Sequence, residues 1–155
     1  MTVSPALSQT QPHYQEPSWF TTYVFNRLFR RLARMGMSVR GSRELRVRGR
    51  TSGAWQSVPV NPLTLDRERY LVAPRGETQW VRNLRAAGCG ELRVGRKVET
   101  FRATEVADAD KAMVLRSYLK HWKFEVGVLF DGVDDTATDE ELVAIGHRHP
   151  VFLLV

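Results

Sequence analysis

A polar loop at residues 49–53 has the residue types most suited to binding a ligand. It reads Gly49-Arg50-Thr51-Ser52-Gly53 and lies between two segments in which apolar and polar residues alternate, as in strands. Glycines permit a close approach of the backbone to a ligand, and the three residues between them can donate hydrogen bonds. The loop therefore suits a phosphate or a carboxylate. The alternative is an ordinary polar hairpin turn.

Three segments that follow the loop make it more informative. They read Ser57-Val58-Pro59-Val60-Asn61-Pro62, Tyr70-Leu71-Val72-Ala73-Pro74-Arg75-Gly76 and Gln79-Trp80-Val81-Arg82-Asn83-Leu84-Arg85-Ala86-Ala87. In this order and spacing, the loop and the three segments resemble the deazaflavin-dependent nitroreductase family, and the resemblance covers residues 45–105. The residues that fit the family pattern are Arg50, Ser52, Gly53, Pro59, Trp80, Asn83 and Leu84.

The resemblance implies a split β-barrel oxidoreductase that transfers a hydride from reduced coenzyme F420 to a small organic substrate. Residues 50–52 would meet the phosphate or the acidic tail of the coenzyme, and its flat ring would lie between Pro59 and Trp80. The expected cofactor-binding residues are Arg50, Thr51, Ser52, Gln56, Ser57, Val58, Pro59, Val60, Asn61, Pro62, Val72, Ala73, Pro74, Arg75, Gln79, Trp80, Val81, Arg82 and Asn83. FMN is the alternative cofactor, because one fold can serve both ligands.

The chemistry of the coenzyme agrees with this placement. Its phosphodiester and its chain of glutamates form a polyanionic tail, which arginine can bind with two parallel hydrogen bonds. The cations available are Arg48, Arg50, Arg75 and Arg82. The ring needs flat apolar walls and a few polar groups for orientation. The coenzyme itself supplies the hydride chemistry. The sequence therefore indicates no catalytic side chain.

The C-terminal third offers candidates for the substrate side of the site. Nitroreductase members place tyrosines beside the ring from this region, and the corresponding stretch here has Tyr118, His121 and Trp122. His121 is either a proton donor or an ordinary surface residue. The family resemblance does not extend to the substrate, and we do not assume that nitro groups are reduced.

A formal net charge of +6 indicates an anionic partner. Residues 1–17 are expected to form a flexible arm, followed by an amphipathic helix at residues 18–36. Its arginine-rich face is either solvated while the helix packs on the barrel, or rests on an anionic membrane surface. A non-enzymatic, basic lipid-binding module is therefore a further alternative. The chain has no recognisable nucleic-acid motif.

The single cysteine, Cys89, excludes an internal disulfide and is expected to be buried. His147 and His149 lack acidic or cysteine neighbours, so we expect no metal site and a solvated turn there. The sequence shows neither a signal-peptide pattern nor a membrane-spanning apolar run. We expect a cytoplasmic protein, peripheral on the inner face of the cell membrane if the helix binds lipid.

The pattern of elements predicts an α+β domain over residues 18–155. About six mostly antiparallel strands would form an FMN-binding-like split β-barrel, with helices packed outside. Strands are expected at residues 44–48, 57–63, 70–73, 91–94, 98–106 and 151–155. Helices are expected at residues 77–87, at 108–121, and at 138–146 after a Thr138-Glu141 capping box.

Overall fold

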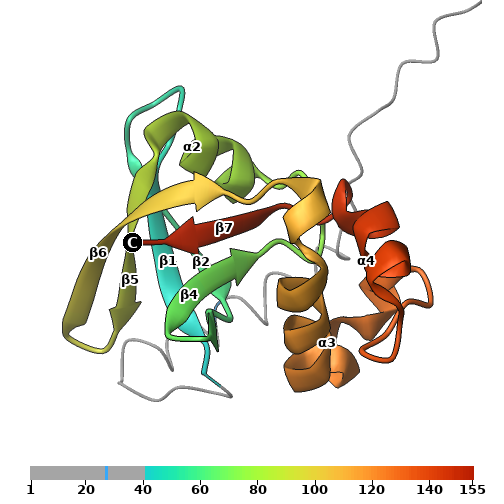
Figure 1. Ribbon diagram of the computed structural model, residues 1–155. Helices are drawn as coiled ribbons and strands as arrows, with labels where there is room; N and C mark the ends of the chain where they lie inside the picture. The colour runs from blue at the N-terminus through green and yellow to red at the C-terminus, as the bar shows by residue number, and fades with distance from the viewer. Residues whose placement is uncertain (1–26, 28–40) are drawn as a thin grey trace, which may run out of the picture.

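The computed structural model describes Arg27 and residues 41–155. The expected arm and almost all of the expected helix at residues 18–36 therefore lie outside the described residues. The remaining chain forms one curled antiparallel sheet with helices against it (Figure 1). This arrangement confirms the predicted split-barrel class.

The sheet has seven strands in the described part of the chain, in the order β2-β1-β5-β6-β7-β4-β3. They are β1 (Arg43–Arg48), β2 (Trp55–Val60), β3 (Leu63–Leu65), β4 (Glu68–Val72), β5 (Cys89–Val94), β6 (Lys97–Glu105) and β7 (Val151–Leu154). The long strand β6 pairs with β5 along its first part and with β7 near its end, so it joins the two halves of the curled sheet. The expected strand at residues 57–63 is instead two strands, β2 and β3, which are separated at Asn61-Pro62.

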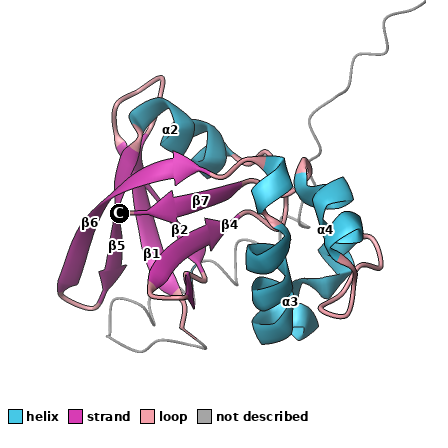
Figure 2. Ribbon diagram, viewed as in Figure 1, coloured by secondary structure: helices cyan, strands magenta, loops and turns pink. Residues whose placement is uncertain are grey.

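The helices cover two different sides of the sheet. They are α2 (Gln79–Ala87), α3 (Ala112–Val126) and α4 (Asp139–Gly146), with short 3-10 turns η1 (Asp108–Asp110) and η2 (Gly127–Phe130). Helix α2 lies beside β1, β5 and β6. Helix α3 packs on β3 and β4, and α4 packs against α3 on the same side of the molecule (Figure 2). Gly88 ends α2 in the left-handed conformation, with φ +69°.

Strands β4 and β7 separate two apolar cores. Leu71 and Phe152 are paired in register and face the inner core with α2, while Val72 and Val151 are paired and face α3. The inner core is made by Leu45, Val47, Leu71, Ala73, Val81, Leu84, Leu92, Phe101, Phe152 and Leu154. Because both faces of the sheet are covered at this point, the paired residues Leu71-Val72 and Val151-Phe152 are all apolar.

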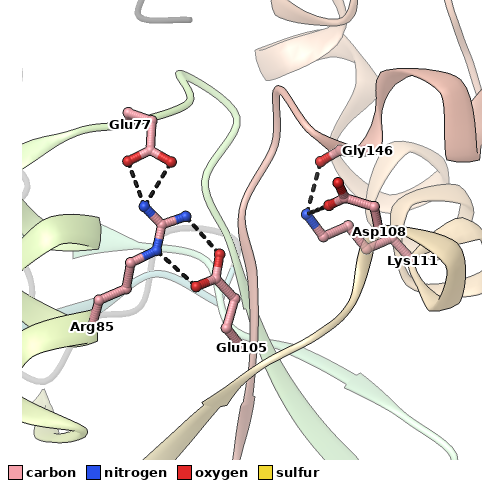
Figure 3. Close-up of polar contacts among 6 residues, drawn as sticks. All are labelled: Glu77, Arg85, Glu105, Asp108, Lys111 and Gly146. Atoms are coloured by element: carbon pink, nitrogen blue, oxygen red, sulfur yellow. Dashed lines mark hydrogen bonds and ion pairs between the residues drawn. The ribbon is translucent and has the colours of Figure 1, made fainter. Parts of the chain in front are cut away.

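Two charged side chains join elements that are distant in sequence (Figure 3). Lys111, which is 2% exposed, donates from Nζ to Asp108 Oδ1 at 2.7 Å and to the Gly146 carbonyl at 2.8 Å. It therefore ties the start of α3 to the end of α4, where a cation also favours the helix dipole. The Thr138-Glu141 capping box at the other end of α4 is formed as predicted.

Arg85 makes the corresponding link on the α2 side (Figure 3). Its guanidinium donates to Glu105 through Nε at 2.7 Å and Nη2 at 2.6 Å, and to Glu77 through Nη1 at 2.7 Å. The hydrogen bonds to Glu105 and Glu77 raise the pKa of Arg85 further above its ordinary value. The pair of carboxylates thus holds the segment before α2 against the end of β6.

Candidate functional site

The loop between β1 and β2 has a conformation that depends on its two glycines. The Gly49 N–H donates to the Ala54 carbonyl at 2.8 Å, and the Gly53 N–H donates to the Gly49 carbonyl at 2.8 Å. Gly53 has φ +69°, and a Cβ at Gly49 would lie only 2.9 Å from Ser52 Oγ. Larger residues would therefore disturb the turn that carries Arg50, Thr51 and Ser52.

Helix α2 holds this loop through a buried asparagine. Asn83, 1% exposed, accepts at Oδ1 from the Arg50 backbone N–H at 3.1 Å and from Arg50 Nη1 at 2.8 Å. Its Nδ2 donates to Gln56 Oε1 at 3.0 Å, and Arg50 Nη1 also donates to Gln79 Oε1 at 2.9 Å. The structure thus brings together four of the sequence-predicted residues: Arg50, Gln56, Gln79 and Asn83.

The same arrangement leaves donors of Arg50 available to a ligand. Within the described part of the chain, no partner is found for Nε or Nη2 of Arg50, and the side chain is exposed. Thr51 and Ser52 are also exposed at the tip. Ser52 Oγ accepts from the Ala54 N–H at 3.2 Å, which leaves its hydroxyl hydrogen free to donate. The tip is therefore a group of oriented donors suited to an oxyanion.

Strand β2 separates the other predicted residues into two sets. Val58 is paired with Leu45 and packs against the inner core, while Pro59 is paired with Glu44 on the opposite face of the strand. Trp80 is on the inner side, because it packs against that core with its ring 6.1 Å from Phe152. The prediction that the coenzyme ring lies between the side chains of Pro59 and Trp80 is therefore wrong, since the two side chains lie on different faces of the sheet.

Several expected wall residues have buried side chains. Ala73 and Val81 are fully buried in the inner core, and Val72, 5% exposed, packs on the side of α3. The half-buried or exposed members of the set are Gln56, Ser57, Val58, Pro59, Val60, Asn61, Pro62, Pro74, Arg75, Gln79, Trp80 and Arg82. Pro62 lines a cavity of about 310 Å³ together with Arg43 and Arg69. That cavity lies at the opposite end of β1 from Arg50.

The segment between β4 and α2 is held from the C-terminal side by a histidine that the sequence did not indicate. His149 is 0% exposed, stacks on Phe130 with ring centroids 4.0 Å apart, and has Nδ1 3.1 Å from the Pro74 carbonyl. Because a carbonyl only accepts, Nδ1 must carry the proton. The prediction of a solvated turn is therefore wrong for His149, which is buried. His147 is exposed, as that prediction required.

The aromatic residues of α3 have structural roles. Tyr118, 2% exposed, packs against Trp122 and Phe130 at centroid distances of 5.0 Å and 6.3 Å. His121 is exposed, and its Nδ1 lies 2.7 Å from the Ser117 carbonyl one turn earlier. Tyr118 and Trp122 therefore belong to the core beneath α3. Burial raises the pKa of the Tyr118 phenol above its ordinary range.

We expect this burial to lower stability in alkali. The unfolded chain releases the Tyr118 proton near pH 10, whereas the folded protein retains it, so the unfolded state binds fewer protons above that pH. The free energy of unfolding should then fall by up to about 1.4 kcal/mol per pH unit. Urea unfolding between about pH 9 and about pH 11 measures the slope. Tyr118→Phe should show a smaller decrease, and equal slopes for both proteins would contradict the expectation.

Three further features bear on the other sequence predictions. Cys89 is exposed, which corrects the expectation of a buried thiol. Among the described residues, no three His, Cys, Asp or Glu side chains gather as ligands for a metal ion. Within the same residues, none of the helices has the length and apolar character needed to cross a bilayer.

The curled antiparallel sheet defines a split-barrel protein, and its arginine-bearing β1–β2 loop is held on α2 through Asn83. The sequence matches the F420H(2)-dependent quinone reductase family over residues 24–126, and the chain belongs to this family. It is an F420H2-dependent reductase with coenzyme F420 as its cofactor. The family match confirms the resemblance found in the sequence.

Solved structures confirm the fold. One neighbour is a domain-swapped dimer, with a TM-score of 0.55 and 16% identity over 87% of this chain and 98% of that chain. Another is an F420-H2 dependent reductase, with a TM-score of 0.53 and 16% identity over 75% of this chain and 95% of that chain. A comparison with curated proteins gave no match.

Proposed function

We propose that this protein reduces a quinone with the hydride of reduced coenzyme F420. The support for a quinone is the family itself, which consists of F420H(2)-dependent quinone reductases. The coenzyme supplies the hydride, and the protein has to hold the ring in register with the acceptor and exclude water. The residues assigned below therefore bind and orient the coenzyme, and none of them carries out the redox step.

The observation that carries the site assignment is the contact between the loop and α2. Asn83 and Gln79 fix one terminal nitrogen of Arg50, and the remaining donors of that guanidinium stay exposed beside Thr51 and Ser52. A guanidinium that is already oriented loses less conformational entropy when it binds. We assign this tip to the phosphodiester of the coenzyme.

The walls of the ring site are assigned to fewer residues than the sequence-based set contains. We assign to them the accessible residues Val58, Val60 and Trp80, which pack against the inner core, together with Gln79 and Arg82 of α2 and with Pro74 and Arg75 of the segment before α2. Val72, Ala73 and Val81 support this wall from the two cores and offer a ligand little more than backbone. Ser57 and Pro59 face the other side of β2, so they would act by shaping the strand.

The activity is tested with reduced F420 and a short-chain, water-soluble naphthoquinone. Oxidation of the coenzyme restores its fluorescence, so the rate should depend on the concentrations of enzyme and quinone. Binding of F420 should saturate, and FMN at the same concentrations should compete weakly. Tight binding of FMN without binding of F420 would overturn the cofactor assignment, whereas turnover with other acceptors but no quinone would overturn the substrate class.

We further propose that residues 18–36 place the enzyme on the inner, anionic face of the cell membrane. The support is in the sequence, whose spacing predicts a helix with Arg27, Arg30, Arg31 and Arg34 on one face and apolar residues on the other. The full chain should sediment with vesicles that contain anionic lipid and stay in solution with neutral vesicles. Deletion of residues 1–35 should abolish sedimentation, and unchanged partitioning would contradict this role.

A further inference from the structure

The inner face of the curled sheet continues past its apolar core into a cavity. The cavity lies at the end of the sheet away from α2, where β1 and β4 begin and β5 turns into β6 (Figure 1). Its volume is about 310 Å³. Arg43, Arg69 and Glu99 line it, and each lies two positions along its strand from a residue of the inner core. The same strand faces are therefore apolar near α2 and charged at the cavity.

The lining of the cavity carries an excess of positive charge. Arg43, Arg69 and Lys97 line it together with a single carboxylate, that of Glu99. Arg69 Nη1 donates to Glu99 Oε2 at 2.6 Å, and Lys97 Nζ lies 3.0 Å from Glu99 Oε1. The hydrogen bonds from Arg69 and Lys97 lower the pKa of Glu99, so this carboxylate is charged at neutral pH. Three cations against one anion make the cavity attractive to a negatively charged ligand.

Arg69 and Thr64 provide hydrogen-bond donors in the cavity. They are direct partners in the register of β3 with β4, and both line the cavity. Over Arg27 and residues 41–155, neither Nε and Nη2 of Arg69 nor the hydroxyl of Thr64 has a hydrogen-bond partner. The hydrogen bond to Glu99 holds one nitrogen of the guanidinium in place. The other donors are therefore oriented for an oxyanion.

Part of the cavity wall is apolar. Leu92, 2% exposed, belongs to the inner core, and Val94 and Pro62 are half-buried. All three line the cavity. Its volume is near the lower end of small-molecule sites, which begin at about 300 Å³, so it suits a ligand of one or two rings. The donors and this apolar wall together match an organic anion with a flat apolar body.

We propose that this cavity binds a small aromatic carboxylate. The carboxylate contacts Arg69 and Thr64, and the rings pack on the apolar wall. The cavity is at the opposite end of β1 from Arg50, and the six residues of that strand span roughly 17 to 20 Å. The site is therefore separate from the tip that we assign to the phosphodiester, and binding there does not require the coenzyme.

The test uses naphthoate, with the naphthamide of the same substitution pattern as its uncharged counterpart. Calorimetric titration of the full chain should show saturable binding of naphthoate, about threefold to tenfold tighter than that of naphthamide. This range is reduced for solvent screening, since the Arg69 side chain is 39% exposed. Inorganic phosphate, which lacks rings, should bind more weakly than naphthoate. Equal affinities for naphthoate and naphthamide would overturn the proposal, as would displacement of naphthoate by coenzyme F420.

Two variants of the cavity should change the affinity in opposite directions. Arg69→Gln removes the main donor, so it should weaken naphthoate binding about threefold to tenfold and leave naphthamide unchanged. Glu99→Gln removes the carboxylate that competes for Arg69 and Lys97, so it should strengthen naphthoate binding about threefold. Weaker binding in Glu99→Gln would mean that the ion pair only supports the strands, and would overturn the proposal.

Arg96→Gln is the matched control. Arg96 is exposed in the turn next to Lys97 but does not line the cavity, so its loss should change the affinity by less than about twofold. Equal weakening by Arg69→Gln and Arg96→Gln would attribute binding to net charge and overturn the proposal. Thr64→Val, at an exposed position, keeps the side-chain shape and should weaken naphthoate about twofold to fivefold. It decides the outcome if circular dichroism shows that Arg69→Gln alters the fold.

Discussion

Replacing Arg50 with alanine is expected to weaken the binding of coenzyme F420 by about tenfold to a hundredfold. The change removes the charge-assisted hydrogen bonds that we assign to the phosphodiester, each worth about 1.5 to 3 kcal/mol. It also removes one of the two donors to Asn83 Oδ1, although the backbone N–H of residue 50 remains. The loop should therefore keep its position while losing its guanidinium.

Titration of each variant with F420 measures the effect, with Arg96→Ala as the matched control. Arg96 is an exposed arginine in the turn between β5 and β6, at the end of the sheet away from the β1–β2 loop. It loses the same charge and should leave the dissociation constant within about twofold. Equal weakening by both variants would mean that net charge, and not the Arg50 contact, governs binding.

The elements that the sequence predicted well carry strong local signals. The Thr138-Glu141 capping box and the end of the helix at residue 87 each depend on a few neighbouring residues. Each was found where it was expected. The polar loop at residues 49–53 was also identified as a unit: Gly53 has a positive φ, and Gly49 lies where a Cβ would come too close to Ser52.

The parts that were missed depend on how strands are paired. Pro59 and Trp80 were expected on opposite walls of one slot, but the register of β2 with β1 directs Pro59 to the outer face. A shift of one residue changes the face of every side chain, and no local pattern fixes that shift. The contact between Trp55 and Arg48, whose Cζ lies 4.1 Å from the indole ring, was missed for the same reason, because only strand pairing places the two residues side by side.

The burial of His149 depends on a still longer-range contact. Its ring stacks on Phe130 and its Nδ1 bonds to the Pro74 carbonyl, 75 positions away. In sequence it is one of two histidines beside an arginine, a pattern that is usually solvated. The contact shows that the segment before α2, which contains Pro74 and Arg75, is positioned by the C-terminal helices.

Replacing Phe130 with alanine is therefore expected to affect both stability and the site. Phe130 is 0% exposed and contacts the rings of Tyr118 and His149. Loss of the ring should lower the free energy of unfolding by about 3 to 5 kcal/mol, the range for large cavities. Urea unfolding measures this loss, and Met113→Ala, at a 59% exposed position on α3, should change it by less than about 0.5 kcal/mol.

The coenzyme provides the second readout for the same variant. With Phe130 removed, His149 loses its stacking partner, so the hydrogen bond that holds the Pro74 carbonyl becomes less constrained. At a temperature where the variant remains folded, its affinity for F420 should fall about threefold to tenfold, because binding then has to order that segment. If the affinity stayed the same while the stability fell, the C-terminal helices would contribute to the fold but not to coenzyme binding. The contacts made by α2 and Arg85 would then suffice to position the segment before α2 for the coenzyme.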